Sequence, residues 1–199
     1  MSVIKLHNSL GNKKEVFIPI NENHIRIYAC GPTVYNYAHI GNARMAVVCD
    51  LLVRFMKHSY PKVTYVSNIT DIDDKIINAS IETNTPIQDL TNKYEKIYNE
   101  NMLELGVLKP DIQPRATEHI KEMIVLITTL IIKNYAYVSE NHVLFNVESY
   151  KNYGLLSGRN KEDQIAGSRI QVANYKKNAG DFILWKPSTE AQPGWESPW

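Results

Sequence analysis

The sequence has little cysteine, almost no net charge and no long hydrophobic run. Two cysteines, Cys30 and Cys49, occur in 199 residues, which is too few for a disulfide framework and fits a reducing compartment. A net charge of +1 gives no basic surface that could hold nucleic acid by charge alone, which weakens but does not exclude RNA binding. No apolar stretch reaches the roughly 18 residues of a membrane span, and the N-terminal segment lacks the apolar core of a signal peptide. We therefore expect a soluble, cytoplasmic protein that does not bind membranes.

What the sequence does contain is a strand–helix–strand–helix rhythm. Hydrophobic residues make up 44% of the chain, enough for a core in one domain or two small ones. Stretches of alternating apolar residues or of residues common in β-strands predict strands, and apolar residues at three- and four-residue spacing predict helices. The predicted elements are a strand at 24–30, a helix at 42–58, a strand at 63–70 and a helix at 74–84. This order is typical of an α/β fold with a parallel sheet. Ligands bind at the carboxyl ends of such strands, where we expect Cys30 and Thr70 to lie close together.

The character of the chain changes near residue 135. Helices are expected at about 87–105 and 116–134, and residues 135–147 resemble a hairpin that turns at 139–141. The remainder is polar and rich in turns. We therefore expect one domain over residues 1–134 and a smaller α+β domain over residues 135–199.

The tetrapeptide His39-Ile-Gly-Asn42 falls where the first helix is expected to begin. A helix N-terminus has free N–H groups and a positive dipole end, which attract anions. His39 and Asn42 lie on one face of the first turn and could add side-chain donors, while Gly41 leaves room for a ring or a phosphate. The alternative is that His39 and Asn42 only cap the helix. Walker and Gly-x-Gly-x-x-Gly nucleotide motifs are absent from this loop.

A longer stretch favours the functional interpretation. "CGPTVYNYAHIGNAR" (residues 30–44) resembles the signature of class I aminoacyl-tRNA synthetases, and specifically that of the cysteinyl-tRNA synthetase family. "YVSNITDIDDKI" (residues 65–76) resembles the second motif of that family. "RATEHI", "YGLLSGR" and "DFILWKP" continue the resemblance in order, so it covers nearly the whole chain.

The resemblance implies a fold, a reaction and a set of site residues. The fold would be the first half of a Rossmann-like parallel sheet, followed by an incomplete connective insertion domain. The reaction would be activation of cysteine by ATP, with magnesium, to cysteinyl-adenylate, followed by transfer to tRNA(Cys). His39 and Asn42 would be catalytic and would bind ATP together with Gly41. The cysteine pocket would include Cys30, Gly31, Thr33 and Thr70.

The resemblance also implies that Cys30 binds zinc, which holds the thiolate of the substrate. Zinc prefers a thiolate to a hydroxyl, so one metal contact could reject serine. The alternative for a lone cysteine is a small core residue. We assign that role to Cys49, which falls on the apolar stripe of its helix, and not to Cys30 beside Gly31-Pro32.

The acidic run "TDIDD" (residues 70–74) has a structural interpretation. We expect Asp71 and Asp74 to form a capping box at the start of the next helix. A magnesium site made from these carboxylates alone is a weak hypothesis, because this pattern is common at helix starts.

Two departures from the family pattern matter for function. Asn42 stands where the class signature has a histidine, although an amide still donates a hydrogen bond. The other three zinc ligands, the Lys-Met-Ser-Lys-Ser loop and the anticodon-binding helices would all follow Trp199, so we expect the 199 residues alone to be inactive. Two alternatives stay open: a ligase that joins cysteine to an amino-sugar through the same adenylate, and a non-catalytic binding module.

Overall fold

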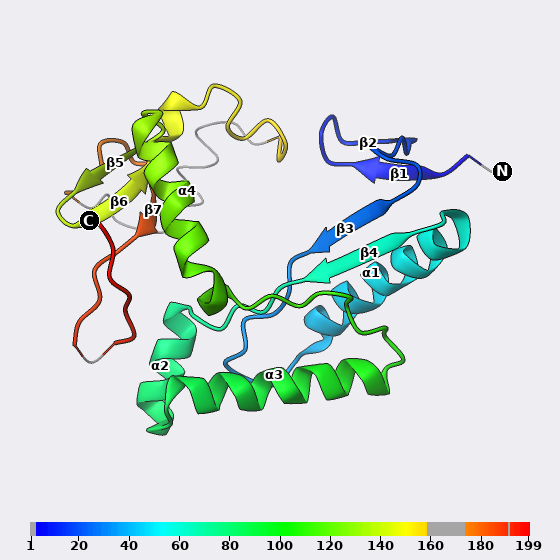
Figure 1. Ribbon diagram of the computed structural model, residues 1–199, viewed down its shortest axis with the longest axis horizontal. Coiled ribbons are helices and arrows are strands. Elements are labelled where there is room, and N and C mark those ends of the chain that lie inside the picture. Colours follow the sequence, from blue (N-terminus) through cyan, green and yellow to red (C-terminus); the bar gives the residue numbers. More distant parts are fainter. Residues whose placement is uncertain (1–2, 159–173, 191) are drawn as a thin grey trace. The chain divides into compact units, whose positions relative to one another are not determined.

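The computed structural model describes residues 3–158, 174–190 and 192–199 (Figure 1). Contacts between Cα atoms divide the chain into two compact units, one of residues 19–119 and one that joins residues up to 18 to residues from 120 onward. The elements in chain order are β1 (Lys5–Asn8), β2 (Lys13–Val16), β3 (Ile25–Ala29), α1 (Ile40–Ser59), β4 (Val63–Ser67), α2 (Asp74–Thr83), α3 (Ile87–Glu104), the 3-10 turn η1 (Ala116–His119), α4 (Ile120–Ile132), β5 (Ala136–Ser139), β6 (His142–Phe145), the 3-10 turn η2 (Val147–Ser149) and β7 (Phe182–Trp185).

The unit of residues 19–119 is built on a parallel strand pair. β3 and β4 run side by side, with Ile25 opposite Val63 and Ala29 opposite Ser67, and α1 connects them (Figure 1). Isolated parallel bridges from Val66 and Ile69 to the segment 112–115 extend the pairing on the outer edge of β4. The predicted strand–helix–strand unit and its parallel sheet are therefore confirmed.

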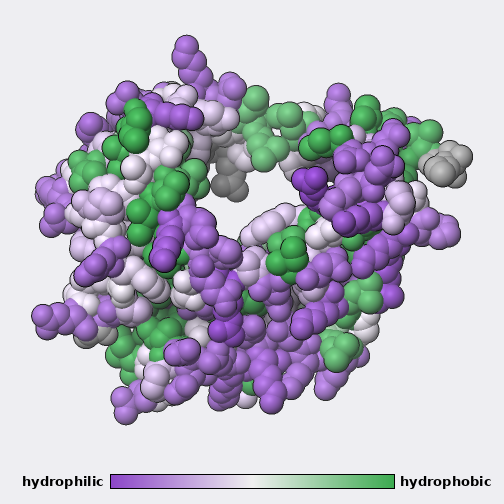
Figure 2. Space-filling model, viewed as in Figure 1, coloured by the Kyte–Doolittle hydropathy of each residue, from purple (hydrophilic) through white to green (hydrophobic). Residues whose placement is uncertain are grey.

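The core of this unit lies between α1, the strands and α3. Val53 of α1 packs with Ala29 and Tyr65 of the strands, because the helix presents an apolar face to the sheet. A second cluster joins Ala46 of α1 to Tyr98 and Met102 of α3 and to Val107 after it. The surface of α3 that faces the viewer is mainly hydrophilic (Figure 2). α3 therefore lies on the outside of the unit with one face turned inward.

The other unit contains a helix and a small antiparallel sheet. β5 and β6 form the predicted hairpin, whose turn residues Glu140 and Asn141 have φ values of 47° and 60°, and β7 pairs with β6 (Figure 1). Ile127 of α4 packs on Ala136 and Val143. The predicted helix 116–134 begins as the 3-10 turn η1 and continues as α4 to Ile132.

One buried carboxylate fixes the loops around this sheet. Asp181 is 1% exposed and accepts hydrogen bonds from the Tyr137 hydroxyl at 2.6 Å and from the Val147 amide at 3.0 Å. Burial and the nearby Asp181 carboxylate raise the pKa of Tyr137 to about 12, so that the phenol keeps its proton as a donor.

The contact-based units differ from the expected domain ranges of 1–134 and 135–199, since residues up to 18 and residues 120–134 group with the segment from 135 onward. For residues 120–134 the reason is the packing of α4 on β5 and β6. The expected ranges stay a prediction about the longer protein.

Among the described residues, none of the helices combines the length and the hydropathy that crossing a bilayer requires.

The loops that leave β3 and β4 are joined backbone to backbone. The Thr70 amide donates to the Pro32 carbonyl at 2.9 Å, and the Val34 amide donates to the Thr70 carbonyl at 3.2 Å. The Gly31 amide donates to the Asn68 side chain at 2.9 Å. These bonds leave no space for a side chain at Gly31, where a Cβ would lie 1.5 Å from the Asn68 carbonyl oxygen.

This close approach gives a stability prediction. We expect Gly31→Ala to lower the free energy of unfolding by about 3 kcal/mol or more, at the upper end of overpacking effects, because a backbone atom must move. Gly180→Ala is the matched control, since a Cβ there meets nothing within 4 Å and should change stability by less than about 1 kcal/mol. Urea unfolding of both variants measures the difference. Equal stability of the two would contradict the proposed contact.

Candidate functional site

The carboxyl ends of β3 and β4 bring several expected site residues to one edge. Thr33 and Thr70 form an isolated parallel bridge, so the loops after the two strands lie side by side, while the expected proximity of Cys30 and Thr70 stays a prediction. Cys30 follows β3 directly and is exposed, with its thiol 3.7 Å from the Gly31 carbonyl oxygen. The edge therefore holds an exposed thiol beside two hydroxyl groups on a hydrogen-bonded loop pair.

The start of α1 is a reciprocal capping box. Nδ1 of His39 accepts from the Gly41 amide at 3.0 Å, and the side-chain oxygen of Asn42 accepts from the His39 amide at 3.1 Å. The capping alternative is thus correct for both residues. It does not compete with a binding role, because it uses only one polar atom of each side chain.

The cap also determines what the two side chains can offer a ligand. An Nδ1 that accepts carries no proton, so the neutral His39 ring carries its proton on Nε2. Asn42 uses its oxygen in the cap and keeps the two hydrogens of its amide nitrogen. Both side chains therefore offer donors at the positive end of a 20-residue helix. A Cβ on Gly41 would lie 2.9 Å from Nδ1 of His39, so the ring is the group for which Gly41 leaves room.

These donors border a cavity of about 160 Å³. Its wall consists of the loop from Pro32 to His39, Asn42, Lys75 of α2, and Tyr94 and Tyr98 of α3. Thr33, His39 and Asn42 are thus brought together, whereas Cys30, Gly31, Gly41 and Thr70 are not among the lining residues. No carboxylate is among the described residues that line it, which favours an anionic ligand.

Four tyrosines and a lysine complete the cavity and were not predicted as site residues: Tyr35, Tyr37, Tyr94, Tyr98 and Lys75. The rings of Tyr37 and Tyr94 meet edge to face with centroids 5.3 Å apart. The Lys75 ammonium lies 5.6 Å from the centroid of the Tyr35 ring. Lys75 stands in the first turn of α2, where the helix dipole disfavours a cation. This unfavourable position could have marked Lys75 as a site residue in the sequence, whereas nothing in the sequence around Tyr94 marks it as one.

The expected capping role of Asp71 is wrong. Asp73 is the N-cap of α2 and accepts from the Lys75 amide at 2.9 Å. Asp71 is buried, 4% exposed, and accepts from the amide of Thr117 at 3.0 Å and from its hydroxyl at 2.5 Å. Its partner lies 46 positions along the chain, so the short-range pattern could not reveal it.

The two cysteines differ as expected. Cys49 is partly buried on α1, with its sulfur 3.6 Å from that of Met45, and burial raises the pKa of its thiol. Cys30 is exposed. Within the described part of the chain, no group of three or more His, Cys, Asp or Glu side chains is arranged to hold a metal ion. These residues offer zinc one thiolate and do not form a complete site.

Comparison with known proteins identifies the family. The family described as "tRNA synthetases class I (C) catalytic domain" matches residues 16–199. A "Cysteine--tRNA ligase" of Parvibaculum lavamentivorans is 55% identical over 196 residues, which cover 98% of this chain and 42% of that protein. A second Cysteine--tRNA ligase, of Ruegeria sp. (strain TM1040), is 52% identical over 202 residues, which cover 100% of this chain and 44% of that protein. The chain thus spans less than half the length of these curated relatives.

Solved structures support the fold. A methionyl-tRNA synthetase of Mycobacterium tuberculosis matches with a TM-score of 0.55 and 15% identity over 63% of this chain and 25% of its own. A leucyl-tRNA synthetase of Agrobacterium radiobacter matches with a TM-score of 0.51 and 17% identity over 63% of this chain and 16% of its own. With the family match over residues 16–199, these findings show that the chain belongs to the class I (C) tRNA synthetase catalytic-domain family and has the expected class I α/β fold.

Proposed function

We propose that the protein containing this chain activates cysteine with ATP and transfers it to tRNA(Cys). The observation that carries the proposal is the capping box of α1, which fixes His39 and Asn42 with donors free at the helix N-terminus. The relatives named Cysteine--tRNA ligase support the choice of amino acid.

His39 and Asn42 would act on the phosphates of ATP. The Nε2–H of His39 and the amide of Asn42 donate to phosphate oxygens, and donors held in place before the reaction stabilise the charge that grows in the transition state. Lys75 lines the same cavity and adds positive charge. Gly41 keeps the imidazole in its capping position. Magnesium would enter with ATP.

Cys30, Gly31, Thr33 and Thr70 would form the cysteine side of the site. Their loops are joined by the backbone hydrogen bonds of Thr70 with Pro32 and with Val34. Zinc, when bound, would prefer the thiolate of the substrate to the hydroxyl of serine. Cys30 would supply one thiolate ligand. The other ligands would come from residues after 199, so the 199 residues alone would not catalyse the reaction.

The role of His39 can be separated from its capping role. Asn is a good N-cap, so His39→Asn should keep the stability of α1 while it removes the Nε2–H donor. In a protein of the relatives' full length, we expect this variant to lower the kcat of pyrophosphate exchange by about 100-fold. His58→Ala, at the exposed C-terminal end of the same helix, is the control and should leave kcat unchanged. A variant with normal kcat and only a raised KM for ATP would refute the transition-state role.

Assays with tRNA(Cys) and an amino-sugar as acceptors distinguish the synthetase from the ligase alternative.

Zinc content tests the role of Cys30. The full-length protein should retain about one equivalent of zinc after dialysis against a mild chelator, since stable sites have three or four protein ligands. The 199-residue chain should retain none. Cys30→Ala should remove zinc and cysteine activation from the full-length protein and leave its unfolding curve intact, whereas Cys49→Ala should keep the metal. One equivalent of zinc on the 199-residue chain would disprove the single-ligand assignment.

A further inference from the structure

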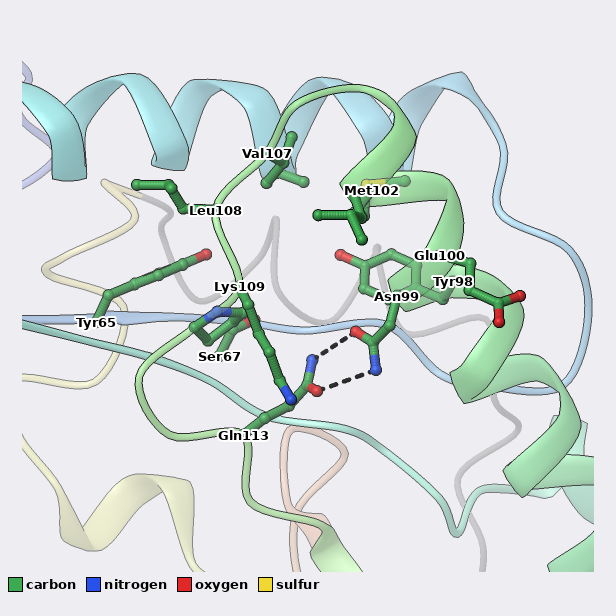
Figure 3. A pocket seen from close by; sticks show the side chains of 13 residues that line it. Tyr65, Ser67, Tyr98, Asn99, Glu100, Met102, Val107, Leu108, Lys109 and Gln113 are labelled. Atoms are coloured by element: carbon green, nitrogen blue, oxygen red, sulfur yellow. Dashed lines mark hydrogen bonds between the residues drawn. The ribbon is translucent and has the colours of Figure 1, made fainter.

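A second cavity of about 260 Å³ borders α3. Figure 3 shows it between β4, α3 and the segment 107–113. Most of its wall is apolar and includes Ala46, Met102, Val107 and Leu108. None of the proposed ATP or cysteine residues lines it.

Two phenol hydroxyl groups point toward one another across this cavity, from Tyr65 of β4 and Tyr98 of α3 (Figure 3). Tyr98 is 8% exposed, and among the described residues its hydroxyl has no hydrogen-bond partner. Burial raises the pKa of Tyr98 to about 12, so the hydroxyl remains a protonated donor. The hydroxyl is not one of the fully buried side-chain atoms that lack a partner, so it stays open to a molecule that enters the cavity and can donate to it.

The other polar side chains of the wall have partners or are exposed, and Ser67 interacts with the Tyr65 hydroxyl. Asn99 and Gln113 bond to each other through two hydrogen bonds of 3.1 Å and close one side (Figure 3). Glu100 and Lys109 carry opposite charges and are exposed. The interior therefore favours an uncharged ligand with a mainly apolar body.

We propose that this cavity is a second small-molecule site, which binds an uncharged aromatic ring whose one polar atom accepts from the Tyr98 hydroxyl. The size fits such a ligand, because an apolar cavity of about 150 Å³ already holds benzene. Met102, Val107 and Leu108 contact the ring, and the Tyr65 hydroxyl, which also interacts with Ser67 and Cys49, lies beside the acceptor.

Tyr98 also lines the cavity of His39 and Asn42. The Tyr98 ring is therefore part of the wall of both cavities. A ligand that moves the ring in one cavity also changes the wall of the other. This coupling rests on the proposed function, whereas binding itself does not. Occupancy of the second site should change the KM for ATP.

The test uses 4-fluorophenol as the probe and the 199-residue chain. We expect saturable binding in the millimolar range by fluorine NMR, the affinity of a fragment of this size. With methyl-labelled methionine, the Met102 signal should shift, while those of Met45 and Met56 should not, since neither lines this cavity. The methyl shifts also report whether each variant is folded.

Tyr98→Phe keeps the ring and removes the donor, so it should weaken binding about fivefold, as expected for one hydrogen bond. Tyr94→Phe, one turn earlier and lining only the cavity of His39, is the matched control and should bind normally. Absence of saturation up to about 10 mM, a shift of Met45 instead of Met102, or equal binding by both variants would overturn the site. Binding with an unchanged KM for ATP in an active full-length protein would overturn the coupling alone. Failure of the proposed reaction would leave the binding result intact.

Discussion

The arrangement of the site depends on the contact between the loop after β3 and the loop after β4. The pairing of β3 with β4 does not stop where the two strands end. It continues through Pro32, Thr33 and Thr70. Gly31 makes this possible, because any side chain there would overlap the Asn68 carbonyl. The loop from Thr33 to His39 therefore begins at a residue that is paired with the loop after β4. This pairing holds the first turn of α1 in place relative to β4.

Within that frame, helix capping and ligand binding are served by the same two side chains. The unsatisfied amides of a helix N-terminus need acceptors, and Nδ1 of His39 and the Asn42 oxygen take that role. The atoms left over are donors, so local stability and affinity for an anion point in the same direction. Asn at position 42 suits this arrangement, because an amide has both an acceptor for the cap and donors for a ligand. In the proposed function, this explains how the departure from the signature histidine could be tolerated.

The parts that the sequence predicted are those governed by local rules. The β3–α1–β4 unit follows from alternating and helical spacing with Gly31-Pro32 between them, and the hairpin around Asn141 follows from its turn residues. The β1–β2 hairpin was missed because its strands are short and polar, although its turn at Gly11 and Asn12 has positive φ values of 84° and 49°. The role of Asp71 was wrong and those of Tyr94 and Tyr98 were missed for another reason. Their neighbours in space are distant in the sequence, and periodicity cannot supply tertiary partners.

The acidic residues near the site have structural partners, and this affects its chemistry. Asp50 accepts from the Leu108 amide at 3.0 Å and Asp111 accepts from the Tyr65 amide at 2.7 Å, so carboxylates fasten the segment after α3 to α1 and β4. Asp71 holds Thr117 in the same way. Within the acidic run, Asp71 accepts from Thr117 and Asp73 caps α2, so these two carboxylates have separate structural roles. The cavity of His39 is lined instead by donors and by Lys75, and the charge that would balance magnesium there would have to come from the phosphates of ATP.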